Sequence, residues 1–282
     1  MRKIFSIIKK ISKPLKLHRF PFFARLNKKI TEKVRTNHAV VDGHAMILDD
    51  KDSLRLSING IYEIEQTNYI KNLLNEGDCA IDIGANIGYY ALVMAKRVGL
   101  SGKVFCFEPD KTNFSILKKN VENNQYSNTV YLYNDAISFE SGKIKLYISE
   151  SNRGDHRIYS SDQNRDFIEI NAIRLDEVKE IMDSDIKLIK IDIQGSEMIA
   201  LESMKKVIKK NKPIIISEFW PKGIRMSGKN AEDYINYYIS VGYSLNLLEG
   251  KGLKKITKVE LDNLVTVEKG NFTNIVFVPL SD

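Results

Sequence analysis

The chain has 282 residues, of which 43% are hydrophobic and 28% charged, a length and composition typical of one large α/β domain or two small ones. Its formal net charge is +7, yet residues 1–40 carry twelve Lys and Arg against one acidic residue, so the other 242 residues sum to −4. An acidic body argues against a nucleic-acid binder, and the longest charge-free stretch, 15 residues over 234–248, is shorter than the roughly 20 residues of a membrane-spanning helix.

Residues 1–37 form a basic arm. Over residues 2–13 the isoleucines gather on one face of a helix and the Lys and Arg side chains on the other, and Pro14 ends the pattern. Such a short basic amphipathic helix suits an anchor on an anionic membrane surface. Two alternatives stay open, namely a helix that packs on its own domain and, less favoured, a transit peptide.

Residues 38–67 predict a small β cap. Asp42-Gly43 is a hairpin turn between Val40–Val41 and Met46–Leu48. Leu54, Leu56 and Ile58 alternate as in a half-buried strand.

Residues 68–282 alternate helical and strand patterns, which predicts a doubly wound, mostly parallel sheet of the α/β class. The chief strands are expected at 79–83, 104–107, 129–133, 188–193, 213–219, 243–248 and 274–278, and the chief helices at 68–75, 87–97, 112–123, 196–209 and 231–240. Segments 143–148 and 167–173 predict an inserted strand pair around a long polar loop. Cys79 and Cys106 lie in apolar runs, which indicates buried thiols and not a disulfide or metal site.

Acidic residues stand at the ends of three successive strands. Asp82 precedes the turn Gly84-Ala85-Asn86-Ile87-Gly88, Glu108 ends the next strand, and Asp135-Ala136 follows the third. In a doubly wound sheet these strand ends share one edge, where ligands bind and a carboxylate can accept both hydroxyls of a ribose. The turn is neither a dinucleotide nor a phosphate loop. The pattern favours an adenosine with a positive centre, and S-adenosylmethionine fits it.

A resemblance supports this interpretation. Tyr62-Glu63, the segment from Asp82 to Tyr90, Phe107-Glu108-Pro109 and the segment from Lys190 to Glu197 resemble the FkbM-type methyltransferase family over roughly residues 40–220. The resemblance implies the class I methyltransferase fold, S-adenosylmethionine as cofactor and O-methylation of hydroxyls on sugars and polyketides. It also implies cofactor contacts by Glu63, Asp82, Gly84, Ala85, Asn86, Gly88, Glu108, Asp135 and Ala136. Many members have Glu where this chain has Gln194.

Methyl transfer to a hydroxyl requires a base and groups that hold the acceptor. His156 is one candidate base, with Asp155 to orient it and Arg157 to bind the acceptor or its phosphate. Asp192, at the end of the fourth strand, is the other candidate, and Glu218 ends the fifth strand. Asp192 and Glu218 could together bind a divalent metal, but no other residue spacing in the sequence indicates a metal site.

The predicted function is therefore an O-methyltransferase that acts on a saccharide, glycolipid or related small molecule. The protein is expected in the cytoplasm, with peripheral attachment to the inner face of the membrane through residues 1–13 as an option. Nucleic acid is not an expected partner, and the oligomeric state is left open. Two other functions remain as alternatives, an RNA ribose O-methyltransferase and a non-catalytic membrane-associated module that retains the fold.

Overall fold

The computed structural model describes residues 36–160, 165–250 and 252–280. The arm helix predicted over residues 2–13 lies outside the described residues. Within those residues, no helix combines the length and the apolar character that a membrane span requires.

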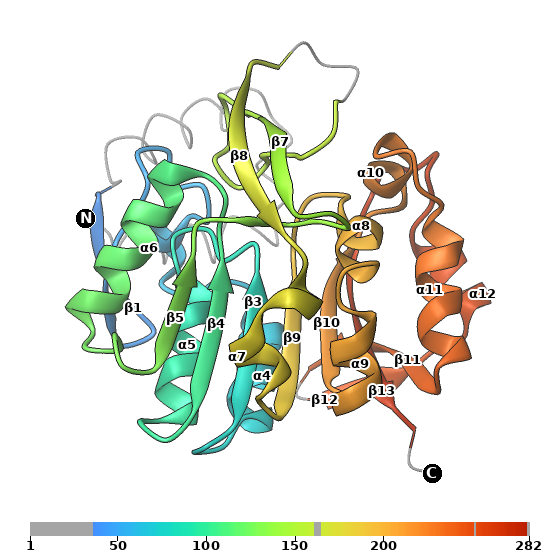
Figure 1. Cartoon of the computed structure of the whole chain (residues 1–282), viewed down its shortest axis with the longest axis horizontal. Helices are drawn as coiled ribbons and strands as arrows, with labels where there is room; N and C mark the ends of the chain where they lie inside the picture. Colours follow the sequence, from blue (N-terminus) through green and yellow to red (C-terminus); the bar gives the residue numbers. More distant parts are fainter. Residues whose placement is uncertain (1–35, 161–164, 251, 281–282) are drawn as a thin grey trace, which may run out of the picture.

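An eight-stranded sheet forms the centre of the described chain (Figure 1). Its strand order is β12-β11-β13-β10-β9-β3-β4-β5. The strands are β3 (Cys79–Ile83), β4 (Lys103–Phe107), β5 (Val130–Tyr133), β9 (Ile186–Ile191), β10 (Ile214–Phe219), β11 (Tyr243–Glu249), β12 (Gly252–Lys255) and β13 (Thr273–Pro279). The five from β5 to β10 are mutually parallel, and β13 runs antiparallel to β10 and β11. The prediction of a doubly wound, mostly parallel α/β sheet is confirmed.

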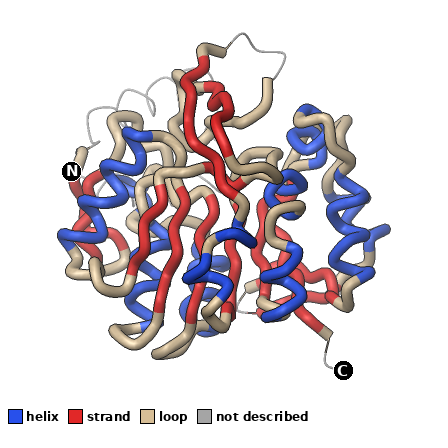
Figure 2. Tube along the Cα trace, in the orientation of Figure 1, coloured by secondary structure: helices blue, strands red, loops and turns tan. Residues whose placement is uncertain are grey.

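Helices cover both faces of this sheet (Figure 2). On one face, Ala80, Val104 and Leu188 pack against helices α4, α5 and α6. On the other face, Ile81 and Ile189 pack against α8, α9 and α11. The helices are α3 (Leu56–Asn59), α4 (Ile64–Leu73), α5 (Tyr89–Val98), α6 (Lys111–Asn123), α7 (Lys179–Met182), α8 (Glu197–Leu201), α9 (Lys205–Asn211), α10 (Pro221–Met226), α11 (Ala231–Ser240) and α12 (Lys258–Leu264). Burial on two sides explains why the central strands are apolar at nearly every position.

The chain enters the sheet at β3, builds outwards through β4 and β5, and returns to the other side of β3 with β9 and β10. The switch point of this winding therefore lies between the carboxyl ends of β3 and β9. Ligands of open α/β sheets bind at such a point, because the connections on either side diverge there and leave a crevice.

The predicted inserted strand pair forms a separate antiparallel unit above that edge of the sheet (Figure 1). Strand β7 (Gly142–Tyr147) pairs with β8 (Phe167–Ile173), and β6 (Ala136–Ile137) adds a third strand. Figure 1 shows β7 and β8 standing beyond the carboxyl ends of β4 and β3. The polar loop after β7 is thereby carried over the switch point.

The segment before the sheet contains a hairpin of β1 (His38–Val41) and β2 (His44–Ile47), as Asp42-Gly43 predicts. Its apolar side chains, among them Val41 and Met46, belong to the same core as α5. The side chain of Asn120 in α6 accepts a hydrogen bond from the Ile47 amide and donates one to the Ile47 carbonyl. The hairpin is thus bound directly to the first helical layer.

Two predicted elements are wrong in form. Residues 54–58 do not make a strand, because Arg55 takes a left-handed conformation and the short helix α3 follows, closed by Gly60. The single helix expected over 196–209 is divided into α8 and α9. Asp176, which lies 30 residues away, accepts hydrogen bonds from the Lys206 and Val207 amides and caps the second helix.

Candidate active site

A cavity of about 250 Å³ opens at the switch point, beneath the loop that joins β7 to β8. Nine of the thirteen residues predicted for the site line this cavity: Gly84, Ala85, Asn86, Glu108, Asp135, Ala136, His156, Asp192 and Glu218. Glu63, Asp82, Gly88 and Arg157 do not line it. The strand ends and the loop therefore bring most of the predicted residues together.

The glycine turn after β3 is shaped by its close neighbours. Gly84 has a φ of +81°, and a Cβ there would collide with the carbonyl oxygen of Asp192. Gly88 has a φ of +93°, and a Cβ there would come within 2.7 Å of Leu117 Cδ1 in α6. Gly84 thus lets β3 meet the loop after β9, whereas Gly88 lets α5 pack close to α6.

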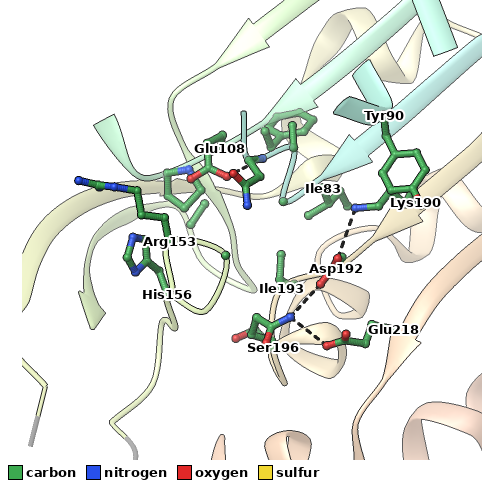
Figure 3. A pocket seen from close by; sticks show the side chains of 18 of the residues that line it. Ile83, Tyr90, Glu108, Arg153, His156, Lys190, Asp192, Ile193, Ser196 and Glu218 are labelled. Carbon is green, nitrogen blue, oxygen red and sulfur yellow. Dashed lines mark hydrogen bonds and ion pairs between the residues drawn. The ribbon is translucent and has the colours of Figure 1, made fainter. Parts of the chain in front are cut away.

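Glu108 is held at the cavity wall by backbone amides (Figure 3). Its Oε2 accepts a hydrogen bond from the Asn86 amide at 2.9 Å, and its Oε1 accepts one from the Asp110 amide at 2.9 Å. Burial raises the pKa of Glu108 to about 8, against the effect of these two donors. A carboxylate has about four acceptor sites, so the ionised Glu108 can accept a further hydrogen bond from a ligand.

Asp135 and Ala136 line the same end of the cavity, just after β5. The preceding Asn134 donates hydrogen bonds to the carbonyls of Glu108 and Pro109, which ties the ends of β4 and β5 together. Burial raises the pKa of Asp135. Asp135 and Ala136 thus give this wall of the cavity one polar and one apolar side chain, a combination that suits the adenine base of an adenosine.

The loop after β7 folds over Glu108 and the start of α6. Arg153 contacts Asp50 through Nε at 2.9 Å, and its carbonyl accepts a hydrogen bond from Asn113. Asp155 does not orient His156 as expected, because its carboxylate pairs with Arg157 and Arg165. Arg157 also lies 4.8 Å from the Trp220 ring centroid and is buried. The predicted role of Arg157 in binding an acceptor therefore has no support in its position.

His156 receives its orientation from the backbone. Its Nδ1 accepts a hydrogen bond from the Ser149 amide at 3.0 Å, and its Nε2 is buried without a partner among the described residues. An accepting Nδ1 means that the neutral ring carries its proton on Nε2. Burial lowers the pKa of His156, which favours this neutral form. With Nδ1 already accepting and Nε2 carrying the proton, the neutral ring has no free lone pair, which argues against its use as the base.

The other end of the cavity is acidic (Figure 3). Gln194 has a left-handed backbone, and its Nε2 donates to Asp192 Oδ1 at 3.0 Å and to Glu218 Oε1 at 2.9 Å. Burial, reinforced by the charge of Asp192, raises the pKa of Glu218 well above its usual range. The amide of Gln194 can donate to both acids, whereas a Glu at this position would add a further negative charge.

Lys190 lines the cavity and balances these charges from its wall. Its Nζ lies 3.4 Å from Asp82 Oδ1 and 3.8 Å from Asp192 Oδ2. Burial opposes its charge, but Asp82, Asp192 and Glu63 raise the pKa of Lys190, so it stays protonated. Asp82 is fully buried and faces Lys190 across the β3–β9 pair. The structure therefore places Asp82 as a counter-ion within the sheet.

Glu63 lies next to this cluster, at the start of α4. Its Oε2 accepts hydrogen bonds from Tyr90 at 2.8 Å and Gln66 at 3.0 Å, and its Oε1 accepts one from Asn274 at 3.0 Å. These donors join α4, α5 and β13 through one carboxylate. The position of Glu63 fits a structural role behind the wall better than direct contact with a ligand.

The predicted set omits Glu197, a buried acidic residue that follows the loop after β9. It is fully buried, and its Oε1 accepts hydrogen bonds from the Gly195 amide at 3.1 Å and the Ile193 amide at 3.3 Å. Burial raises the pKa of Glu197 to about 7. The carboxylate holds the loop that carries Asp192 and Gln194. The sequence signal that could have identified Glu197 is its position three residues after Gln194, within the segment that resembles the FkbM family.

The two ends of the cavity differ in chemistry. Figure 3 shows His156 and Arg153 on the side of Glu108, away from Glu218. Two buried atoms that have no hydrogen-bond partner in the described part of the chain, His156 Nε2 and Asn86 Oδ1, also belong to residues of the cavity wall. The Glu108 end can hold an adenosine, and the Asp192 end can receive a proton. No group of three His, Cys, Asp or Glu in the part of the chain that the structure describes is placed to hold a metal ion.

Affinity for S-adenosylmethionine is expected to rise as the pH increases from 6 towards 9. The raised pKa of Glu108, about 8, means that the empty site holds the neutral acid at low pH, whereas two ribose hydroxyls require the carboxylate. Glu108→Gln is expected to weaken binding by roughly 100-fold, since charge-assisted hydrogen bonds contribute about 1.5–3 kcal/mol. It should also flatten the pH dependence. Titration calorimetry across pH checks both points, and a pH-dependent affinity in the variant would contradict this role.

Comparison with known proteins supports a family assignment. A family model described as the Methyltransferase FkbM domain matches residues 82–245. A methyltransferase FkbM from Methylobacillus flagellatus KT is 14% identical with a TM-score of 0.46, over 88% of this chain and 57% of that chain. An rRNA methylase from Streptococcus thermophilus is 9% identical with a TM-score of 0.43, over 77% of this chain and 95% of that chain. A protein from Streptococcus mutans described as a methyltransferase, in complex with SAH, is 8% identical with a TM-score of 0.44, over 76% and 96%. No curated protein matches the chain.

Proposed function

The chain belongs to the FkbM methyltransferases, which use S-adenosylmethionine, and on that premise we propose that it methylates a hydroxyl of a saccharide, glycolipid or related small molecule. The observation that carries the proposal is that one cavity has two different ends, with Glu108 held by backbone amides at one end and the acidic residues Asp192 and Glu218 at the other. S-adenosylmethionine supplies an electrophilic methyl group. The residues of the chain have to orient it, bind the acceptor and remove its proton.

Asp192 is the better of the two candidate bases. It lines the cavity, its side chain is 23% exposed, and Lys190 at 3.8 Å stabilises its negative charge. His156 offers a donor and lies at the other end of the cavity. Glu218, as the neutral acid, can donate a hydrogen bond to the oxygen of the substrate hydroxyl. Asp192 thus takes up the proton, whereas Glu218 binds the oxygen.

The proposed reaction is balanced within the site. The acceptor hydroxyl gives its proton to Asp192, its oxygen forms a bond to the methyl carbon, and the bond from that carbon to sulfur breaks. Held in line, the two reactants gain up to about 7–11 kcal/mol over free collision. Attachment of residues 1–13 to an anionic membrane stays a prediction, because these residues lie outside the described part of the chain.

The test is methyl transfer from labelled S-adenosylmethionine to a panel of neutral saccharides by the full chain. Mass spectrometry is expected to show one added methyl group on a hydroxyl, together with S-adenosylhomocysteine. Transfer to RNA ribose and not to any saccharide would favour the alternative of an RNA methyltransferase. Absence of transfer to either class, despite cofactor binding, would contradict the proposal.

A further inference from the structure

An exposed aromatic ring stands at the acidic end of the cavity. Phe272 lines the cavity and is 57% exposed. It directly precedes β13, in which Asn274 lies opposite Glu218 and Thr273 opposite Phe219. The same antiparallel register, extended by one step, brings Phe272 opposite Trp220. A ring with this exposure gains little from its own packing, and its place in the cavity wall leaves it available to a ligand.

The segment that carries Phe272 is held in place by its neighbours. The Trp220 indole donates a hydrogen bond to the Gly270 carbonyl at 3.2 Å. Asn274, two residues after Phe272, donates to Glu63. The chain on both sides of Phe272 is therefore anchored, and Phe272 itself is an exposed residue of the cavity wall. An exposed ring beside hydrogen-bonding groups suits a ligand with one apolar face.

The charges at this end limit that ligand further. Lys190 is the cation that lines the cavity here, and it is 3% exposed and paired with Asp82 and Asp192. Arg153, the other lining Lys or Arg among the described residues, pairs with Asp50 and lies on the side of Glu108. A negative group next to the reacting hydroxyl would face the charge of Asp192, and no unpaired Lys or Arg among the described residues lines the cavity to offset it.

We propose that Phe272 is the platform on which the acceptor ring stacks, and that the subsite takes sugar rings without negative charge next to the reacting hydroxyl. This inference rests on the proposed function. The ring covers the apolar C–H face of the sugar, while Asp192 and Glu218 bind its hydroxyl groups. Phe272 is thus a specificity-determining residue for the methyl transfer.

Trp220, the only tryptophan in the sequence, provides the measurement. Its fluorescence is followed in the full chain with S-adenosylhomocysteine present while neutral methyl glycosides are added, with glucuronic acid for comparison. Phe272→Ala is expected to raise the saccharide Kd at least about tenfold, and Phe272→Tyr is expected to restore it. Phe167→Ala is the matched control, because Phe167 is 51% exposed on β8 and does not line the cavity.

The outcomes separate this inference from the proposed function. Saccharide affinity that falls in Phe272→Ala alone, with unchanged affinity for S-adenosylhomocysteine, supports the platform. Wild-type saccharide affinity in Phe272→Ala overturns the platform and leaves the proposed function intact. Glucuronic acid that binds as tightly as the neutral sugars overturns the charge selection. A wild-type chain that binds S-adenosylhomocysteine and none of the saccharides overturns both.

Discussion

Asp192→Asn is expected to lower kcat by a factor of roughly 10²–10⁴, the contribution of a positioned general base. The substitution keeps the size of the side chain and leaves an oxygen that can still accept the hydrogen bond from Gln194. It removes the proton acceptor that faces the cavity. The affinity for S-adenosylmethionine is expected to change much less, because Asp192 lies at the opposite end from Glu108 (Figure 3). Single-turnover kinetics together with calorimetry measure the two effects separately.

A control variant tests whether the effect is specific to Asp192. Glu63→Gln removes one carboxylate from the same cluster, but Glu63 does not line the cavity and its oxygens serve Tyr90, Gln66 and Asn274. Its effect on kcat is expected to be less than about tenfold. Equal losses in the two variants would show that kcat depends on the charge of the cluster, and would remove Asp192 from the role of base. If His156→Gln lowered kcat as much as Asp192→Asn does, His156 would again be a candidate for the base.

Most of the fold could be predicted because its signals are local. Apolar runs bounded by turns gave the central strands, and the alternation with helices indicated a parallel sheet. Helix α9 shows where this reasoning fails. Asp176 caps it from another segment, so no residue next to Lys205 marks the break.

The candidate site was predictable to the extent that strand ends define it. Glu108, Asp135, Asp192 and Glu218 all follow or end parallel strands, and all line one cavity. The partners of polar side chains were not predictable, because they come from distant segments. His156 is oriented by the Ser149 amide and not by the adjacent Asp155, which pairs with two arginines. This difference changes the inferred role of His156 from base to donor.

The direction in which the Asp82 side chain leaves its strand determines which residues it contacts. Its neighbours Ile81 and Ile83 face the core that contains α8 and α9, so Asp82 points to the opposite layer, where α5 contributes Tyr90. There it meets Lys190, whose Nζ also lies 4.9 Å from the Tyr90 ring centroid. The motif predicts that Asp82 contacts the cofactor, whereas the structure pairs it with Lys190 inside the sheet under the site.

Asp82→Ala is consequently expected to lower the free energy of unfolding by about 3–5 kcal/mol, the usual result of leaving one charge of a buried pair without its partner. Lys190 would keep the more distant Asp192 as its ion-pair partner. The double variant Asp82→Leu with Lys190→Met is expected to recover much of that loss, because it removes both charges and keeps apolar volume. Urea unfolding of the single and double variants measures this coupling.

Folded Asp82→Ala should still bind S-adenosylmethionine within about tenfold of wild type by calorimetry, since Asp82 does not line the cavity. Wild-type stability combined with lost cofactor binding would instead establish Asp82 as a direct ligand-binding residue.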